Sequence, residues 1–230
     1  MNKSITANIN EIKHRIGVAA ARCGRDPHTV KLMAATKTVA PERIKEAVDA
    51  GITLFGENYV QEAKEKIALL GKNIQWHMIG HLQTNKAKYV VHLFDCVQSV
   101  DRVELALELD KRARLAGYKI NALIEVNVSG EQTKSGVPAP EAIELVKKTA
   151  ALENISVRGL MTMPPYCEIP EDSRPHFREL KKLSRQISDA QIPGVRMDEL
   201  SMGMTDDFEV AIEEGATIIR VGRAIFGERK

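Results

Sequence analysis

The sequence predicts a single (β/α)8 barrel with one extra helix in front of it. Three observations support this: eight short apolar runs, the amphipathic segments between them, and a chain of 230 residues. Short strands that are almost entirely apolar indicate a parallel sheet covered by helices. Eight such units within about 250 residues fit a closed barrel. A doubly wound open sheet is the alternative, but Gly56-Glu57-Asn58 lacks the GxGxxG spacing of that fold's nucleotide site.

The extra helix is expected within residues 1–24. Ile5, Ile9, Ile12 and Ile16 recur there at helical spacing, and Gly24 suits a helix end. The barrel is expected within residues 30–227, so the whole chain, 1–230, would form one domain.

Strands are expected at the eight apolar runs, since each is short and suits a strand buried on both faces. The runs are KLMAAT (31–36), ITLFG (52–56), WHMIG (76–80), CVQSV (96–100), NALIEVNV (121–128), VRGLMTM (157–163), DELSMGM (198–204) and TIIRVG (217–222).

Helices are expected at the segments of helical period between these runs. Several of them open with Pro, Asp or Asn and close on Gly, which are typical start and stop residues. The segments are 41–51, 57–71, 85–94, 101–117, 138–152, 174–190 and 206–215.

Composition excludes several classes of protein. The net charge of +2 comes from interspersed signs without a basic stripe, so no nucleic-acid partner is expected. Three widely spaced cysteines fit neither a disulfide framework nor a zinc ribbon. No signal-peptide core is present, and no segment approaches the roughly 18 apolar residues of a membrane span. We therefore expect a cytoplasmic protein that does not contact membranes.

Polar residues gather where the predicted strands end, and the loops of a barrel build their sites there. Lys37 follows the first run. Partial burial near other cations favours the neutral amine of a lysine, which can attack a carbonyl group. A lysine that reaches out to solvent is the alternative.

The loops after the seventh and eighth runs suit a phosphate group. Ser201 supplies a hydroxyl, Gly203 and Gly222 allow close approach of the backbone, and Arg223 adds a positive charge. Glycines that only form tight turns are the alternative.

Two further pairs of residues are expected to be structural. Asp206 has capping-box spacing with Glu209, so Asp206 and Asp207 should cap the helix that follows and face away from an anion. His77 and His81 lie four positions apart on a strand, roughly 13 Å, which is too far for one zinc ion. We expect no metal, with His77 in the interior and His81 at the mouth.

Several motifs, taken in order, resemble those of the pyridoxal phosphate homeostasis proteins. The resemblance runs from about Ile5 to Gly227. The motifs are AATKTV, GENYVQEAKEK, WHMIGHLQTNKAKYV, IEVNVSGEQTKSGV, VRGLMTMPPY and LSMGMTDDFEVAIEEGATIIRVGRAIFG.

The resemblance implies a barrel of the alanine racemase N-terminal-domain type, which is fold type III among pyridoxal-phosphate proteins, without the racemases' second domain. It implies that Lys37 holds pyridoxal 5'-phosphate (PLP) as an internal aldimine and that Asn58 lies beside the ring. Ser201, Gly222 and Arg223 would hold the phosphate group, together with the Gly203 turn.

Two more positions take their meaning from the resemblance. Arg220 would face the pyridine nitrogen; a permanent cation there leaves that nitrogen unprotonated and makes the ring a poorer electron sink. Lys134 matches a lysine proposed to handle the cofactor in relatives, although a solvated loop lysine is an equal alternative. Val39 stands where some relatives have a second lysine.

The resemblance favours a non-catalytic protein that stores, shields or delivers PLP and so influences amino-acid and keto-acid pools. Apo forms of PLP-dependent enzymes would be the recipients, and we expect a monomer. A small PLP-dependent amino-acid racemase is the alternative, and it would need a second acid or base opposite Lys37. A barrel aldolase that uses Lys37 directly on a carbonyl substrate is the third hypothesis.

Overall fold

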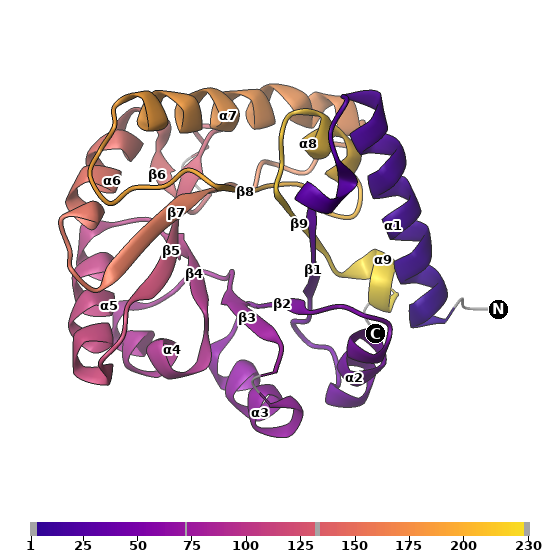
Figure 1. Ribbon diagram of the computed structural model, residues 1–230, viewed down its shortest axis with the longest axis horizontal. Coiled ribbons are helices and arrows are strands. Elements are labelled where there is room, and N and C mark those ends of the chain that lie inside the picture. The colour runs from indigo at the N-terminus through magenta and orange to yellow at the C-terminus, as the bar shows by residue number, and fades with distance from the viewer. Residues whose placement is uncertain (1–3, 72, 132–133, 228–230) are drawn as a thin grey trace.

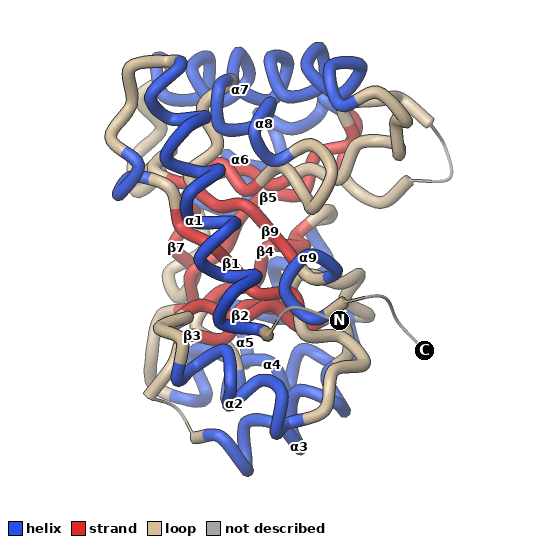
Figure 2. Tube along the Cα trace, turned by 90° about the vertical axis from the view of Figure 1, so that its right-hand side faces the viewer, coloured by secondary structure: helices blue, strands red, loops and turns tan. Residues whose placement is uncertain are grey.

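A computed structural model describes residues 4–71, 73–131 and 134–227. Eight parallel strands form a closed barrel, and helices surround it (Figures 1 and 2). The strands of the barrel are β1 (Lys31–Ala35), β2 (Leu54–Glu57), β3 (Gln75–Met78), β4 (Cys96–Val100), β5 (Ile120–Asn127), β7 (Ile155–Met161), β8 (Glu199–Ser201) and β9 (Ile218–Val221).

Two strand pairs close the cylinder. β1 pairs with β9, with Lys31 opposite Ile218, and β4 pairs with β5, with Cys96 opposite Asn121. The predicted (β/α)8 barrel is therefore confirmed, and the doubly wound sheet is wrong. A two-residue strand, β6 (Val137–Pro138), also pairs with the end of β5.

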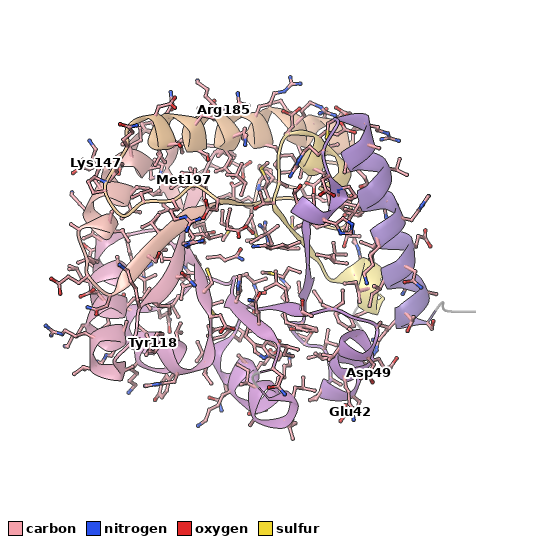
Figure 3. The ribbon with its side chains drawn as sticks, viewed as in Figure 1. Glu42, Asp49, Tyr118, Lys147, Arg185 and Met197 are labelled. Carbon is pink, nitrogen blue, oxygen red and sulfur yellow. The ribbon has the colours of Figure 1, made fainter. Side chains whose placement is uncertain are left out.

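The helices lie outside the barrel, where Glu42, Asp49, Lys147 and Arg185 are exposed to solvent (Figure 3). They are α1 (Ile5–Arg22), α2 (Pro41–Asp49), α3 (Val60–Leu70), α4 (Ala87–Leu93), α5 (Val103–Ala116), α6 (Ala142–Ala150), α7 (Arg174–Asp189), α8 (Phe208–Glu213) and α9 (Arg223–Phe226). None of those described is long and apolar enough to cross a membrane.

The extra helix predicted at the start of the chain is α1. The Ser4 side chain caps it by accepting a hydrogen bond from the Ala7 amide, and its four predicted isoleucines are buried. Asn8 donates a hydrogen bond to the Ile225 carbonyl at 2.9 Å, and Arg15 pairs with Glu209 at 2.6 Å. These contacts hold α1 against α8 and α9, beside the last strands of the barrel.

The shortest barrel strand explains how the site loops form. β8 ends at Ser201, three residues before its apolar run does, because Gly203 turns the chain with φ +89°. A Cβ at Gly203 would lie 2.5 Å from the Cβ of Ala211, so this glycine lets α8 pack against the turn. Gly203 therefore serves local packing.

Candidate functional site

A cavity of about 370 Å3 opens where the carboxyl ends of the strands meet. Five of the predicted site residues line it: Lys37, Asn58, Arg220, Gly222 and Arg223. Ser201 and Gly203 are buried and do not line it, and Lys134 is exposed on the loop after β5 and is not among the lining residues. The structure thus gathers side chains that are up to 186 positions apart, from Lys37 to Arg223.

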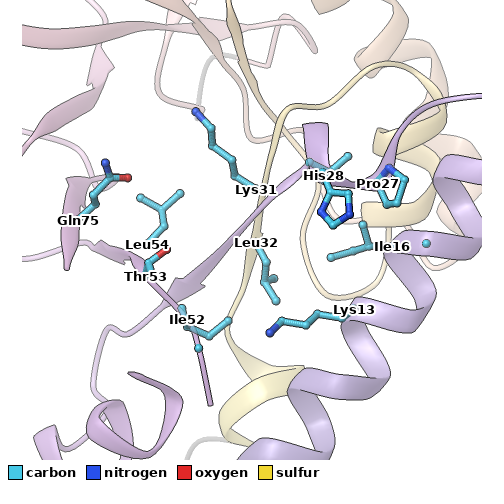
Figure 4. A pocket seen from close by; sticks show the side chains of 13 residues that line it. Lys13, Ile16, Pro27, His28, Lys31, Leu32, Ile52, Thr53, Leu54 and Gln75 are labelled. Carbon is cyan, nitrogen blue, oxygen red and sulfur yellow. The ribbon is translucent and has the colours of Figure 1, made fainter. Parts of the chain in front are cut away.

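A larger cavity, of about 710 Å3, opens at the opposite end of the barrel (Figure 4). Lys13 and Ile16 of α1, His28, and the first residues of β1 and β2 line it. It contains none of the predicted site residues, so size alone does not identify the site.

Lys37 lies on a tight turn directly after β1. The preceding residue, Thr36, is fully buried, and its amide donates a hydrogen bond to the Gly56 carbonyl at 2.9 Å. The following residue, Thr38, has φ +63°, a left-handed conformation that a β-branched residue rarely adopts. The turn directs a half-buried lysine to the cavity wall.

Arg220 is a buried charge at the floor of the cavity, with 3% of its surface exposed. Its guanidinium donates hydrogen bonds to Ser201 Oγ at 2.8 Å and to the Thr162 carbonyl at 2.7 Å. Burial lowers its pKa to about 10, while Asp207 and Glu125 raise it. Arg220 therefore stays charged at neutral pH.

A chain of hydrogen bonds continues from Arg220 down the barrel. Ser201 Oγ donates to Gln98 Oε1 at 2.6 Å, and Gln98 Nε2 donates to His77 Nδ1 at 2.8 Å. Burial lowers the pKa of His77 to about 3, so the ring is neutral and its Nδ1 can accept. The expectation that His77 is a paired interior residue is confirmed.

Ser201 differs from the sequence-based expectation in its position. It is fully buried, and its hydroxyl is shared between Arg220 and Gln98. The hydroxyl that lines the cavity from the same loop belongs to Thr205. In this structure Ser201 supports Arg220 from below, and Thr205 is placed to meet a ligand.

The predicted capping role of Asp206 and Asp207 is wrong. α8 starts at Phe208 with Asp207 as its N-cap residue, and neither aspartate side chain makes a cap hydrogen bond. Asp207 instead accepts from the Met204 amide at 2.6 Å and so closes the preceding turn. Asp206 lines the cavity and pairs with Arg223, because the turn at Gly203 points it toward the site.

The backbone of Asn58 is held by the next loop of the barrel. A Cβ at Gly80 would lie 2.4 Å from the Asn58 carbonyl oxygen, so a glycine is required there. The Oδ1 atom of Asn58 is buried and has no hydrogen-bond partner among the described residues. Such an atom at a cavity wall suits a ligand that supplies a donor.

Sequence reasoning missed several lining residues, among them Thr205 and Tyr166. Thr205 could have been found from its place after the Gly203 turn. Tyr166 follows the sixth barrel strand, β7, by five positions in an irregular loop, and no periodic pattern shows how far its side chain reaches. Within residues 4–71, 73–131 and 134–227, no group of His, Cys, Asp and Glu side chains is arranged to hold a metal ion.

The sequence matches the family "Alanine racemase, N-terminal domain" over residues 7–230. A pyridoxal phosphate homeostasis protein from Aquifex aeolicus (strain VF5) is 48% identical over 223 residues, which cover 96% of this chain and 97% of that protein. The protein of the same name from Escherichia coli (strain K12) is 37% identical, with 98% and 97% covered. The chain belongs to the pyridoxal phosphate homeostasis protein family.

Solved structures agree with this family. PipY from Synechococcus elongatus PCC7942, determined with PLP bound, superposes with a TM-score of 0.81 at 34% identity, covering 94% of this chain and all of PipY. An uncharacterised protein from Bifidobacterium adolescentis reaches a TM-score of 0.93 at 39% identity, with 96% and 94% covered. An alanine racemase from Clostridium difficile shares the fold, with a TM-score of 0.74 at 16% identity over 57% of its chain.

Proposed function

We propose that this homeostasis-family protein binds PLP in the cavity at the strand ends and acts in the storage, shielding or delivery of that cofactor. The observation that carries the proposal is the placement of Lys37 in one cavity with Arg220, Asn58 and the loop that contains Gly222 and Arg223. The PLP-bound PipY and the names of the curated relatives support it.

The lining residues fit the parts of PLP. The Lys37 amine would condense with the aldehyde, with loss of one water molecule, and leave a C=N bond. Gly222, Arg223 and Thr205 would bind the phosphate group through backbone N–H, guanidinium and hydroxyl donors. The Oδ1 atom of Asn58, which has no hydrogen-bond partner in the part of the chain that the structure describes, would face a donor on the ligand or on bound water, beside the ring.

The positive charge of Arg220 favours a role in carrying the cofactor over a role in catalysis. PLP supplies an electron sink to a bound amine when its pyridine nitrogen is protonated. A guanidinium, charged at neutral pH and hydrogen-bonded to Ser201 and Thr162, would leave that nitrogen unprotonated. We therefore propose a non-catalytic carrier that hands PLP to apo-enzymes, with Lys134 as a candidate second contact. A cytoplasmic, monomeric protein remains the expectation, and light scattering tests the monomer.

The deciding experiment is trapping of PLP with borohydride. Purified protein mixed with PLP should turn yellow, and borohydride should fix the pyridoxyl group to the peptide that contains Lys37. Lys37→Met should abolish the fixed product, whereas Lys64→Met, an exposed lysine on α3, should leave it intact. A wild-type protein that remains colourless and unmodified would refute PLP binding and favour the aldolase hypothesis.

A racemase-like enzyme is the second candidate, because Tyr166 lines the cavity and could act opposite Lys37. The ring is 74% exposed, however, and no hydrogen bond within the described chain fixes it. Exchange of the α-hydrogen of L- and D-alanine in D2O separates the two functions. Turnover by the loaded protein would favour the enzyme, and absence of exchange supports the carrier.

A further inference from the structure

A buried ion network lies directly below the turn that carries Lys37. Glu57 is the last residue of β2, and Glu62 and Lys66 lie one turn apart on α3. The Lys66 side chain is 7% exposed and that of Glu57 is fully buried. Among the described residues, these charged groups form hydrogen bonds with one another, with Thr36 and with Thr38.

All three N–H donors of the Lys66 ammonium group have acceptors. Nζ donates to Glu57 Oε1 at 2.8 Å, to Glu62 Oε2 at 3.0 Å and to the Thr36 carbonyl at 2.7 Å. The same Glu57 oxygen accepts from Thr36 Oγ1 at 2.6 Å. A lysine on a helix thus holds the backbone of the residue immediately before Lys37.

The residue after Lys37 is held by the same network. The amide of Thr38 donates to Glu62 Oε2 at 2.9 Å, the oxygen that also accepts from Lys66. Both neighbours of Lys37 are therefore tied to one ammonium group, Thr36 directly and Thr38 through Glu62. The tie on Thr38 stabilises its left-handed conformation at φ +63°.

A contribution to the stability of the fold does not by itself explain why these charged groups are buried. Burying charges is costly, and apolar residues of similar volume often stabilise a core as well as a buried ion pair does. Glu57 Oε2 also has no hydrogen-bond partner among the described residues, so the network is not fully satisfied. What it does supply is a fixed position and direction for the backbone at Lys37.

We propose that Lys66, together with Glu57 and Glu62, is a positioning residue that holds the Lys37 amine where it can bond to the aldehyde of PLP. The inference rests on the proposed function and deepens it. Lys66 does not line the cavity, so it acts only through the turn. A displacement of the attacking atom by about 1 Å can slow a reaction roughly a hundredfold, so small shifts of this turn matter.

The test compares PLP with pyridoxine 5'-phosphate, which carries an alcohol in place of the aldehyde and cannot bond to Lys37. Lys66→Met and Glu62→Ala should slow formation of the C=N bond, followed by absorbance, by roughly tenfold or more. The Kd for pyridoxine 5'-phosphate should change much less, because the phosphate contacts come from the loops after β8 and β9 and the backbone of Asn58 also packs against Gly80. Lys64→Met and Glu65→Ala, exposed residues on the same helix, are the matched controls.

Three results would overturn the inference. The first is an unchanged rate in both variants, and the second is an equal loss of affinity for both ligands, which would indicate a merely structural role. The third is an effect of the control variants as large as that of Lys66→Met. If Lys66→Met fails to fold, Glu62→Ala, which changes a partly exposed residue, decides alone. Failure of the wild-type protein to trap PLP would instead refute the proposed function.

Discussion

Asp206 and Arg223 form an ion pair at the rim of the cavity, where the phosphate group of PLP is proposed to bind. Their side chains are 45% and 46% exposed, so solvent screens the pair and its contribution to stability is small. The carboxylate would nevertheless compete with a bound phosphate group for the same guanidinium. At the scale of single residues, we therefore expect Asp206 to weaken retention of the ligand, which would suit the proposed carrier.

Asp206→Asn should bind PLP more tightly, by roughly threefold to tenfold at low salt, because one negative charge leaves the proposed phosphate site. The measurement is a titration of PLP at two salt concentrations, and the gain should shrink at the higher one. Asp189→Asn, an exposed residue at the end of α7, is the control. Weaker binding by Asp206→Asn would mean that this carboxylate orients Arg223 for the ligand.

At the scale of elements, the turn between β8 and α8 depends on Gly203. This residue combines φ +89° with a hypothetical Cβ only 2.5 Å from Ala211 Cβ and 3.0 Å from Phe208 Cα. Any side chain would push α8 away from the barrel. Packing of α8 against the turn therefore explains a glycine at this position of the predicted phosphate loop, whether or not a ligand binds there.

Gly203→Ala should lower the free energy of unfolding by about 2 kcal/mol or more, through overpacking added to the strain of a positive φ. Gly194→Ala is the matched control, since Gly194 has φ +77° but no atom of the described residues lies within 4 Å of its Cβ position. That control should cost only about 1 kcal/mol. Urea denaturation measures both, and equal losses would contradict the packing explanation.

At the scale of the whole molecule, the barrel interior holds charges whose titration affects global stability. Glu125 of β5 is 3% exposed, and its Oε2 has no hydrogen-bond partner within the described chain. Burial, with a smaller contribution from Asp101, raises the pKa of this carboxyl to about 7, while Arg220 lowers it. The folded protein therefore holds a proton that the unfolded chain releases near pH 4.5.

A carboxyl with a raised pKa contributes stability below its unfolded pKa and loses that contribution as pH rises through the folded value. Between about pH 4.5 and pH 7, Glu125 should thus lower the free energy of unfolding by on the order of 2 to 3 kcal/mol, while neutral His77, whose pKa is lowered to about 3, acts in the opposite direction below about pH 6.5. Glu125→Gln should remove this contribution, so its stability relative to wild type should rise with pH and be greater than that of wild type at pH 8.

Urea denaturation across that pH range checks the Glu125 prediction. Glu46→Gln, an exposed carboxylate on α2, should keep the wild-type slope. Parallel curves for wild type and Glu125→Gln would show that the buried carboxyl does not titrate in this window.

Much of the fold could be predicted because local patterns carry it. The isoleucines of α1 follow the helical period of 3.6, and the eight short, nearly continuous apolar runs are typical of strands buried on both faces. The two-residue β6 and the early end of β8 were missed, because such short elements depend on pairing with β5 and on the Gly203 turn.

The candidate site was predicted less completely. Lys37, Asn58, Arg220, Gly222 and Arg223 line one cavity, as their positions at strand ends indicated. Ser201 lies below that cavity, and its hydroxyl is taken by Arg220 and Gln98, which no local pattern shows. Whether a strand-end side chain faces the cavity or the layer beneath depends on barrel register.

The sequence by itself determined the barrel, the leading helix and the lysine at the end of β1, because hydrophobic period and turn residues act over a few positions along the chain. Only the tertiary structure decided which side chains from different segments come into contact. Examples are Lys66 beneath the Lys37 turn, Asp206 on Arg223, and the chain from Arg220 to His77. These contacts join segments that lie far apart in the sequence, and the pairing of neighbouring strands together with closure of the barrel brings them close in space.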